Sequence, residues 1–313
     1  MRLLNEILGT KYPIIQGGMA NIATGEFAAA CSNAGALGLI GAGGMNADTL
    51  RQNIRRCKEL TDKPFGVNIM LMHPQADEFA KIVVEEGVQV VTTGAGNPGK
   101  YMEAWKAAGI RVFPVVASVA LAKRMERAGA DGIIAEGCES GGHIGSITTM
   151  CLVPQVVDAV SIPVLAAGGI ADGRGLAAAL MFGAQGVQMG TVFLASEECR
   201  IHPVYKDLVL SAKDTDTAVT GEICGGAPCR QIKTRYTRRV NERERAGATF
   251  AEIEELTVGS LRRAVQDGDK ENGSFMCGEI AGLVKELRPC AKILEDIFTQ
   301  GEAVMKDRLR LIK

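Results

Sequence analysis

Eight short apolar segments, each followed by glycine or by polar residues, recur through residues 1–200 of this 313-residue chain. The segments are apolar along their whole length, which is typical of parallel strands that are buried on both faces. Between them lie stretches with apolar residues at helical spacing, such as 76–86 and 119–128. The predicted strands are Tyr12–Gln16, Leu37–Ile40, Phe65–Val67, Val88–Val91, Val112–Val116, Gly132–Ile134, Pro163–Leu165 and Gly186–Gln188.

Eight strand–helix units can close into a ring, so the sequence predicts an α/β protein whose residues 1–200 form a (β/α)8 TIM barrel. The alternative is an open doubly wound sheet, because spacing alone does not prove closure. Residues 201–272 contain few strand-like segments and predict a smaller, mainly helical subdomain on the substrate and cofactor side. Residues 273–313 are expected to return to the barrel and to end in a terminal helix, Ala291–Arg308.

Composition excludes several classes of function. A formal net charge of −1 and only 4% aromatic residues argue against nucleic-acid binding. No apolar run approaches the roughly 20 residues of a membrane span, and the N-terminal residues do not resemble a signal peptide. We therefore expect a cytoplasmic protein without a membrane partner. The nine cysteines are scattered, without a C-x-x-C pair or histidines at zinc-ligand spacing, so no metal site is predicted from them.

One glycine-rich loop contains the candidate catalytic residue. The loop, residues 135–145, follows the predicted strand Gly132–Ile134 and includes His143, one of three histidines in the chain. Active sites of such barrels form at the carboxyl ends of the strands, and histidine titrates near neutral pH. The alternative is that His143 only shapes a pocket wall. Glu136, in the same loop, is either a solvated acid or a cofactor contact with a shifted pKa.

The loops after the seventh and eighth strands have the composition of an anion site. Ala167, Gly168 and Gly169 follow one strand, and Gly190 and Thr191 follow the other. Backbone N–H groups that glycine leaves accessible, next to a helix N-terminus, bind phosphate well. Each loop alone could equally be a tight turn, but the two together favour a phosphate site.

Three amides at or near strand ends match the edge of a flat heteroaromatic ring such as isoalloxazine, which alternates hydrogen-bond donors and acceptors. They are Gln16, Asn68 and Gln188, and backbone groups of Gly17, Gly18 and Met19 lie beside the first of them. Each amide taken singly is as consistent with an ordinary strand-end cap.

Seven segments carry a family resemblance: Ile15–Met19, Phe65–Asn68, Thr92–Pro98, Glu136–His143, Ala166–Ile170, Gln188–Thr191 and Gly273–Gly278. Together they resemble the nitronate monooxygenase-like flavoproteins, and the chain as a whole is most similar to the FMN-dependent enoyl-[acyl-carrier-protein] reductases of that superfamily. The resemblance implies a barrel that holds FMN, which NAD(P)H reduces. It also implies reduction of a trans-2-enoyl thioester on acyl carrier protein in bacterial fatty acid elongation, a homodimer, and stimulation by a monovalent cation with unknown ligands.

Under this interpretation His143 donates a hydrogen bond to the acyl carbonyl or delivers a proton. The runner-up function is nitronate monooxygenase, in which His143 removes the α-proton of a nitroalkane. A barrel that binds a phosphate ligand without catalysis is a further alternative. The basic run Arg230–Arg239 is either a solvated face, a strip that steers the acidic carrier protein, or a binding site for the 2′-phosphate of NADPH, so the preference between NADH and NADPH stays open.

Overall fold

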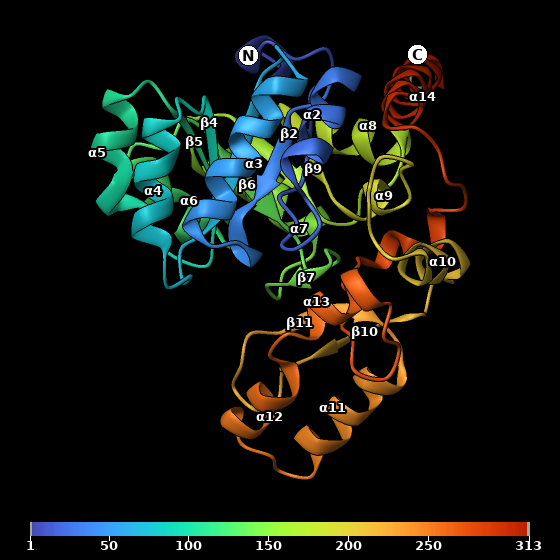
Figure 1. Ribbon diagram of the computed structural model, residues 1–313. Helices are drawn as coiled ribbons and strands as arrows, with labels where there is room; N and C mark the ends of the chain where they lie inside the picture. Colours follow the sequence, from blue (N-terminus) through green and yellow to red (C-terminus); the bar gives the residue numbers. More distant parts are fainter. Residues whose placement is uncertain (1, 312–313) are drawn as a thin grey trace.

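The eight apolar segments form eight parallel strands in the computed structural model, which describes residues 2–311 (Figure 1). Their order around the sheet is β1-β9-β8-β6-β5-β4-β3-β2. The predicted strands are therefore all confirmed, within a few residues at their ends. The observed bounds are β1 (Ile14–Gln16), β2 (Gly38–Gly41), β3 (Phe65–Met70), β4 (Val90–Gly94), β5 (Arg111–Val116), β6 (Ile133–Glu136), β8 (Val164–Ala167) and β9 (Gly186–Met189).

A short seam between β1 and β2 closes the sheet into a barrel. Ile15 and Leu37 form a parallel bridge. The N–H of Gln16 donates to the carbonyl of Leu37 at 3.0 Å, and the N–H of Leu37 donates to the carbonyl of Ile14 at 2.9 Å. The first and last strands in the sheet order are thus hydrogen-bonded to each other, which distinguishes a barrel from an open doubly wound sheet.

Helices follow the strands and cover the outside of the barrel (Figure 1). Each turns its buried residues toward the sheet, as the 3.6-residue spacing predicts. Side-chain caps mark several starts; for example, the hydroxyl of Ser118 accepts a hydrogen bond from the N–H of Leu121. The helices are α2 (Gly25–Ala34), α3 (Ala47–Leu60), α4 (Ala76–Glu85), α5 (Gly99–Ala107), α6 (Val119–Arg127), α7 (Thr149–Ala159) and α8 (Gly173–Met181).

The interior of the barrel is filled at one end only. Ile15, Phe113 and Leu165 belong to a buried apolar cluster inside the ring of strands. The same cluster includes Leu4 and Leu8 of α1 (Leu4–Leu8), a helix held by a hydrogen bond from the N–H of Leu4 to the carbonyl of Gln185, just before β9. Helix α1 therefore covers the amino ends of the strands and leaves the carboxyl ends to form a site.

The chain beyond β9 differs partly from the sequence prediction. It is mainly helical, as expected, but it also contains β10 (Thr217–Thr220) and β11 (Cys229–Ile232), which were not predicted. These strands pair with β7 (Gly142–His143) in an antiparallel sheet of order β10-β11-β7. The other elements are α9 (Thr191–Leu194), α10 (Pro203–Ser211), α11 (Arg235–Arg245), α12 (Phe250–Thr257), α13 (Ser260–Arg262), the π-helical turn Arg263–Asp267 and the 3-10 helix η3 (Glu279–Leu283).

Figure 1 shows α11 and α12 projecting farthest from the barrel, on the side of β7. The last helix, α14 (Cys290–Leu311), instead packs against α8 and α2. Close approach there requires glycine, since a Cβ on Gly173 would lie 2.2 Å from the backbone nitrogen of Gly301. The boundaries at residues 200 and 272 between barrel, subdomain and return segment stay predictions.

Candidate active site

A cavity of about 1280 Å³ opens at the carboxyl ends of the barrel strands. It extends from the barrel mouth to the elements after β9, including α12 and α13. Every residue that the sequence predicts for the site, with the exception of Gln16, lines this cavity. These residues are Gly17, Gly18, Met19, Asn68, Glu136, His143, Ala167, Gly168, Gly169, Gln188, Gly190 and Thr191.

The side chain of Gln16 lies in the barrel seam and is fully buried. Its Oε1 accepts a hydrogen bond from the N–H of Leu39 at 3.0 Å, and its Nε2 donates to the carbonyl of Gly17. The amide thus continues the backbone pairing of β1 and β2 by one more hydrogen bond. The structure gives Gln16 a role in closing the barrel and does not bring its side chain to the cavity.

The other two amides differ in their partners. Oδ1 of Asn68 accepts from the hydroxyl of Thr92 at 2.8 Å, and Nδ2 donates to the carbonyl of Gly18 at 3.2 Å. The orientation of the Asn68 amide is therefore set, with one N–H left for a ligand. Gln188 as a residue is 9% exposed, and its side-chain amide forms no hydrogen bond within residues 2–311. An amide that reaches a cavity wall without a protein partner is well suited to bind a ligand.

Glycine is required at two positions of the predicted cradle. Gly168 has φ of +87°, and a Cβ there would lie 2.8 Å from the carbonyl oxygen of Gly137. A Cβ on Gly18 would lie 2.2 Å from Cβ of Asn68. The backbone at both positions is exposed to the cavity without a side chain in the way. Thr191, by contrast, uses its hydroxyl to accept a hydrogen bond from the N–H of Gly278 at 2.8 Å, which holds the return segment against the barrel.

Glu136 ends β6 at the cavity wall. Burial raises the pKa of this carboxyl to about 7, and the neighbouring hydroxyl of Ser140 opposes that rise. A carboxyl with such a pKa is partly protonated at neutral pH and can donate as well as accept a hydrogen bond.

His143 lies in β7, in the glycine-rich loop that follows β6, and its side chain is exposed at the cavity. The strand pairs with β11, so that His143 stands opposite Cys229 and Gly142 opposite Arg230. The N–H of Ile144 also donates to the carbonyl of Pro228 at 3.0 Å. The histidine loop is therefore held by the part of the chain beyond β9 as well as by the barrel.

Some cavity residues could not be found by sequence reasoning. Arg124 on α6 and Arg262 on α13 carry the only arginine side chains that line the cavity within residues 2–311. Both are exposed, and no motif distinguishes them from other surface arginines. An apolar wall from the outer elements was also not predicted; it includes Phe250, Ile253 and Leu261.

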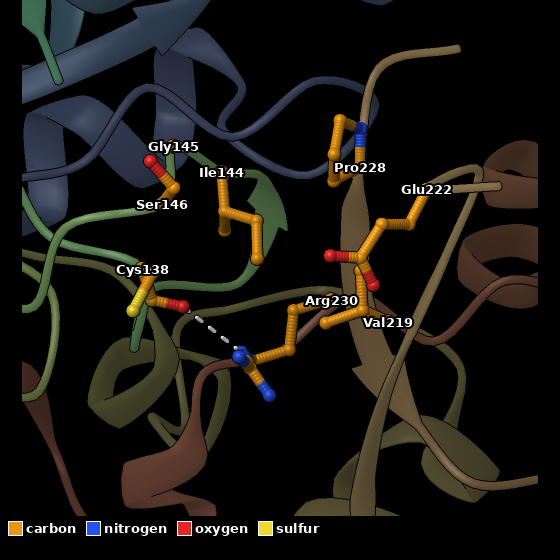
Figure 2. Close-up of a pocket in the computed structure, with 8 residues that line it drawn as sticks. All are labelled: Cys138, Ile144, Gly145, Ser146, Val219, Glu222, Pro228 and Arg230. Carbon is orange, nitrogen blue, oxygen red and sulfur yellow. Dashed lines mark hydrogen bonds between the residues drawn. The ribbon is translucent and has the colours of Figure 1, made fainter. Parts of the chain in front are cut away.

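The basic run Arg230–Arg239 does not contribute a cationic side chain to this cavity. Its first member, Arg230, lies instead at a separate pocket of about 390 Å³ behind the histidine loop, which Figure 2 shows.

Neither a membrane-spanning helix nor a metal-binding cluster is found in residues 2–311. No helix there is long and apolar enough to cross a membrane, and no three His, Cys, Asp or Glu side chains gather where they could bind a metal ion.

Comparison with known proteins gives consistent matches along the chain. A family model described as nitronate monooxygenase matches residues 1–300. A probable nitronate monooxygenase of Staphylococcus saprophyticus is 35% identical over 346 residues, which cover 96% of this chain and 97% of that protein. A (3aS,4S,5R,7aS)-5-hydroxy-7a-methyl-1-oxo-octahydro-1H-indene-4-carboxyl-CoA dehydrogenase of Mycobacterium tuberculosis is 33% identical, covering 94% of each chain. A structure of FabK from Thermotoga maritima superposes with a TM-score of 0.96 at 51% identity and covers 100% of both chains.

Proposed function

Because the chain belongs to the nitronate monooxygenase family, we propose that it is an FMN- and NAD(P)H-dependent enoyl-[acyl-carrier-protein] reductase of fatty acid elongation. The observation that carries this proposal is the similarity along the whole chain to FabK, an enoyl-[acyl-carrier-protein] reductase II. The geometry of the cavity is consistent with it in three respects: the cofactor contacts, the volume, and the position of the histidine.

The cavity residues fit FMN. Backbone groups at Gly168, Gly169 and Gly190 would hold its phosphate, as in other barrels with a phosphate site after the last two strands. The amides of Asn68 and Gln188 would face the edge of the ring. Glu136 would accept or donate a hydrogen bond to the ribityl chain. When bound, FMN supplies the hydride that is added to the β-carbon of the substrate.

The volume leaves space for a second molecule. Pockets for a single small ligand usually measure about 300–1000 Å³, and this cavity is larger at about 1280 Å³. The elements after β9 contribute the apolar side chains of Phe250, Ile253 and Leu261 to the cavity wall, which suit an acyl chain. The same cavity would thus hold the flavin at the barrel mouth and the thioester between the mouth and α12.

His143 would act on the thioester. Addition of hydride to the β-carbon moves negative charge onto the thioester oxygen, and a proton must then reach the α-carbon. A hydrogen-bond donor near that oxygen stabilises the charge, and an imidazole that titrates near neutrality can deliver the proton. His143 is the one histidine among the residues that line the cavity.

Nitronate monooxygenase activity is the second candidate, because the matching family model and several relatives carry that description. The same cavity and histidine would serve it, with the imidazole taking the α-proton of a nitroalkane. The two functions differ in what reduces the flavin and in what reoxidises it.

One experiment separates them. The purified, FMN-loaded protein is mixed anaerobically with NADH, with NADPH, or with a nitroalkane, and flavin absorbance is followed. Reduction by either pyridine nucleotide and reoxidation by crotonyl thioester support the reductase. Reduction by the nitroalkane alone would contradict it. The homodimer, the cytoplasmic location, the acyl carrier protein partner and the monovalent cation stay predictions.

A further inference from the structure

Arg230 connects three segments of the chain behind the histidine loop. Its Nε donates to the carbonyl of Cys138 at 3.1 Å, and its Nη1 lies 2.9 Å from Oε1 of Glu279 and 3.3 Å from the hydroxyl of Thr217. Figure 2 shows the guanidinium directed at the Cys138 carbonyl across the small pocket. The Arg230 side chain is only 11% exposed, which is unusual for an arginine unless its charge is paired.

The contacts of Arg230 lie on both halves of the loop that bears His143. Its backbone pairs with Gly142, the residue before the histidine. Its side chain holds Cys138, five positions before His143 in the sequence. A single residue of β11 thus fixes the loop where it leaves β6 and again beside the imidazole.

The planar guanidinium is suited to this task. It presents several donors in a rigid fork, which a lysine ammonium does not reproduce. The Glu279 side chain is 46% exposed, so its carboxylate would remain in contact with water if the Arg230 guanidinium were removed. A further contact also reaches the loop, because the N–H of Glu279 donates to the carbonyl of Glu139 at 2.9 Å. Loss of the Arg230 side chain should therefore loosen the loop without unfolding it.

From this geometry we infer that Arg230 is a positioning residue, which holds the His143 loop in the conformation needed for reduction of the enoyl thioester. This inference rests on the proposed function for its catalytic part. It also gives the start of the basic run a different role from steering or phosphate binding, because the side chain is enclosed between the loop and β10.

The test compares Arg230→Met with Arg230→Lys and with Arg238→Met. Arg238 belongs to the same basic run but is exposed and forms no side-chain hydrogen bond in residues 2–311, so it is a matched control. Two measurements are made on the FMN-loaded proteins. The first is hydrogen exchange of the backbone amides in residues 137–146. The second is turnover of crotonyl thioester, alongside the rate of flavin reduction by NAD(P)H.

For Arg230→Met we expect faster amide exchange in residues 137–146 and a kcat for the thioester lower by about 10- to 100-fold, the size of effect that a misplaced catalytic group produces. The rate of flavin reduction and the affinity for FMN should not change, because neither uses His143. In Arg230→Lys we expect smaller changes of the same kind, both in amide exchange and in kcat. Arg238→Met should resemble the unmodified protein.

Two results would overturn the inference. One is unchanged exchange in Arg230→Met; the other is faster exchange with an unchanged kcat, which would show that the loop conformation does not matter to the reaction. If the unmodified protein fails to reduce any enoyl thioester, the proposed function fails instead. The exchange experiment then still decides whether Arg230 holds the loop.

Discussion

The hydroxyl of Thr92 donates a hydrogen bond of 2.8 Å to Oδ1 of Asn68, its direct neighbour across strands β4 and β3. Thr92 is fully buried, whereas Asn68 lies at the cavity wall. A hydroxyl can accept from Nδ2 as well as donate to Oδ1, but the carbonyl of Gly18, which accepts from Nδ2 of Asn68 at 3.2 Å, can only accept. The two bonds together therefore set which end of Asn68 faces the ligand. Thr92, although it does not line the cavity, thereby helps to decide whether Asn68 offers a ligand a hydrogen-bond donor or an acceptor.

Replacement of Thr92 by valine should therefore weaken FMN binding. Without the hydroxyl, only the bond to the Gly18 carbonyl orients the Asn68 amide, and the looser orientation should cost about 1–2 kcal/mol of FMN binding, or about 5- to 30-fold in the dissociation constant. Fluorescence titration with FMN measures this.

Thr93→Val is the matched control for that substitution. The Thr93 hydroxyl is buried and has no partner in the part of the chain that the structure describes. Its removal should leave FMN affinity unchanged and raise the free energy of unfolding by up to about 1 kcal/mol. Equal FMN affinities in both variants would contradict the assigned role of Thr92.

Glu136 should make stability depend on pH in a defined direction. Burial raises its pKa from 4.5 to about 7, so between these values the folded protein binds more protons at this site than the unfolded chain does. The free energy of unfolding should therefore fall as the pH rises from about 4.5 to about 7, by at most about 3 kcal/mol. Urea unfolding of the protein and of Glu136→Gln at several pH values isolates this contribution. A constant difference between the two proteins across that range would refute it.

His143→Ala should lower the kcat for enoyl thioester reduction by about 100- to 10,000-fold, the usual contribution of a general acid or base. Flavin reduction by NAD(P)H should continue at its normal rate. His73→Ala serves as the control, since His73 lies in a turn outside the cavity and stacks on Phe79. Normal turnover in His143→Ala with FMN bound would show that His143 only shapes the pocket wall and takes no part in catalysis.

Gly168→Ala should destabilise the protein and impair FMN binding together. The new Cβ would combine a positive φ with a contact of 2.8 Å to the Gly137 carbonyl, which together cost about 2–4 kcal/mol. Gly94→Ala is the control, because Gly94 also lines the cavity but a Cβ there meets no atom within 4 Å. Thermal unfolding with and without FMN tests both; an undisturbed Gly168→Ala would show that the cradle is not needed.

Arg124 should bind an anionic part of a substrate at the barrel side of the cavity. Its replacement by alanine is expected to raise the KM for NADPH or for the acyl-carrier-protein thioester about fivefold at low salt with kcat unchanged, and the effect should shrink as salt is added. Arg127 is a matched control on the same helix, exposed but outside the cavity. If Arg127→Ala changes KM as much as Arg124→Ala, the effect is one of general surface charge.

The barrel could be predicted from sequence because its signals are local. Each buried parallel strand is a continuous apolar run, and each is followed by a helix whose spacing is visible in the same few residues. Strands β10 and β11 were missed because they are short and polar, and because β11 is paired with β7, which lies more than 80 residues earlier in the sequence. Nothing in either segment alone specifies that pairing.

Site residues could be predicted from the sequence where they directly follow the carboxyl end of a buried strand. Asn68, Glu136 and Gly168 follow buried strands, and the parallel arrangement necessarily brings such residues to one end of the barrel. Gln16 satisfies the same rule, yet its side chain bonds to Leu39 in the seam. Arg124 and Arg262 satisfy no such rule, since they come from helices that reach the cavity only through packing.

The amino-acid sequence by itself therefore determined the order and type of the barrel elements, the end of the barrel at which the site forms, and the loop that bears His143. These follow from local patterns and from the geometry of parallel strands. Only the tertiary structure decided that the ring closes through Ile15 and Leu37, that Thr92 orients Asn68, and that Arg230 reaches Cys138. Each of these is a contact between residues distant in sequence, and the free energy of such a contact depends on the exact position of two segments that no local pattern encodes.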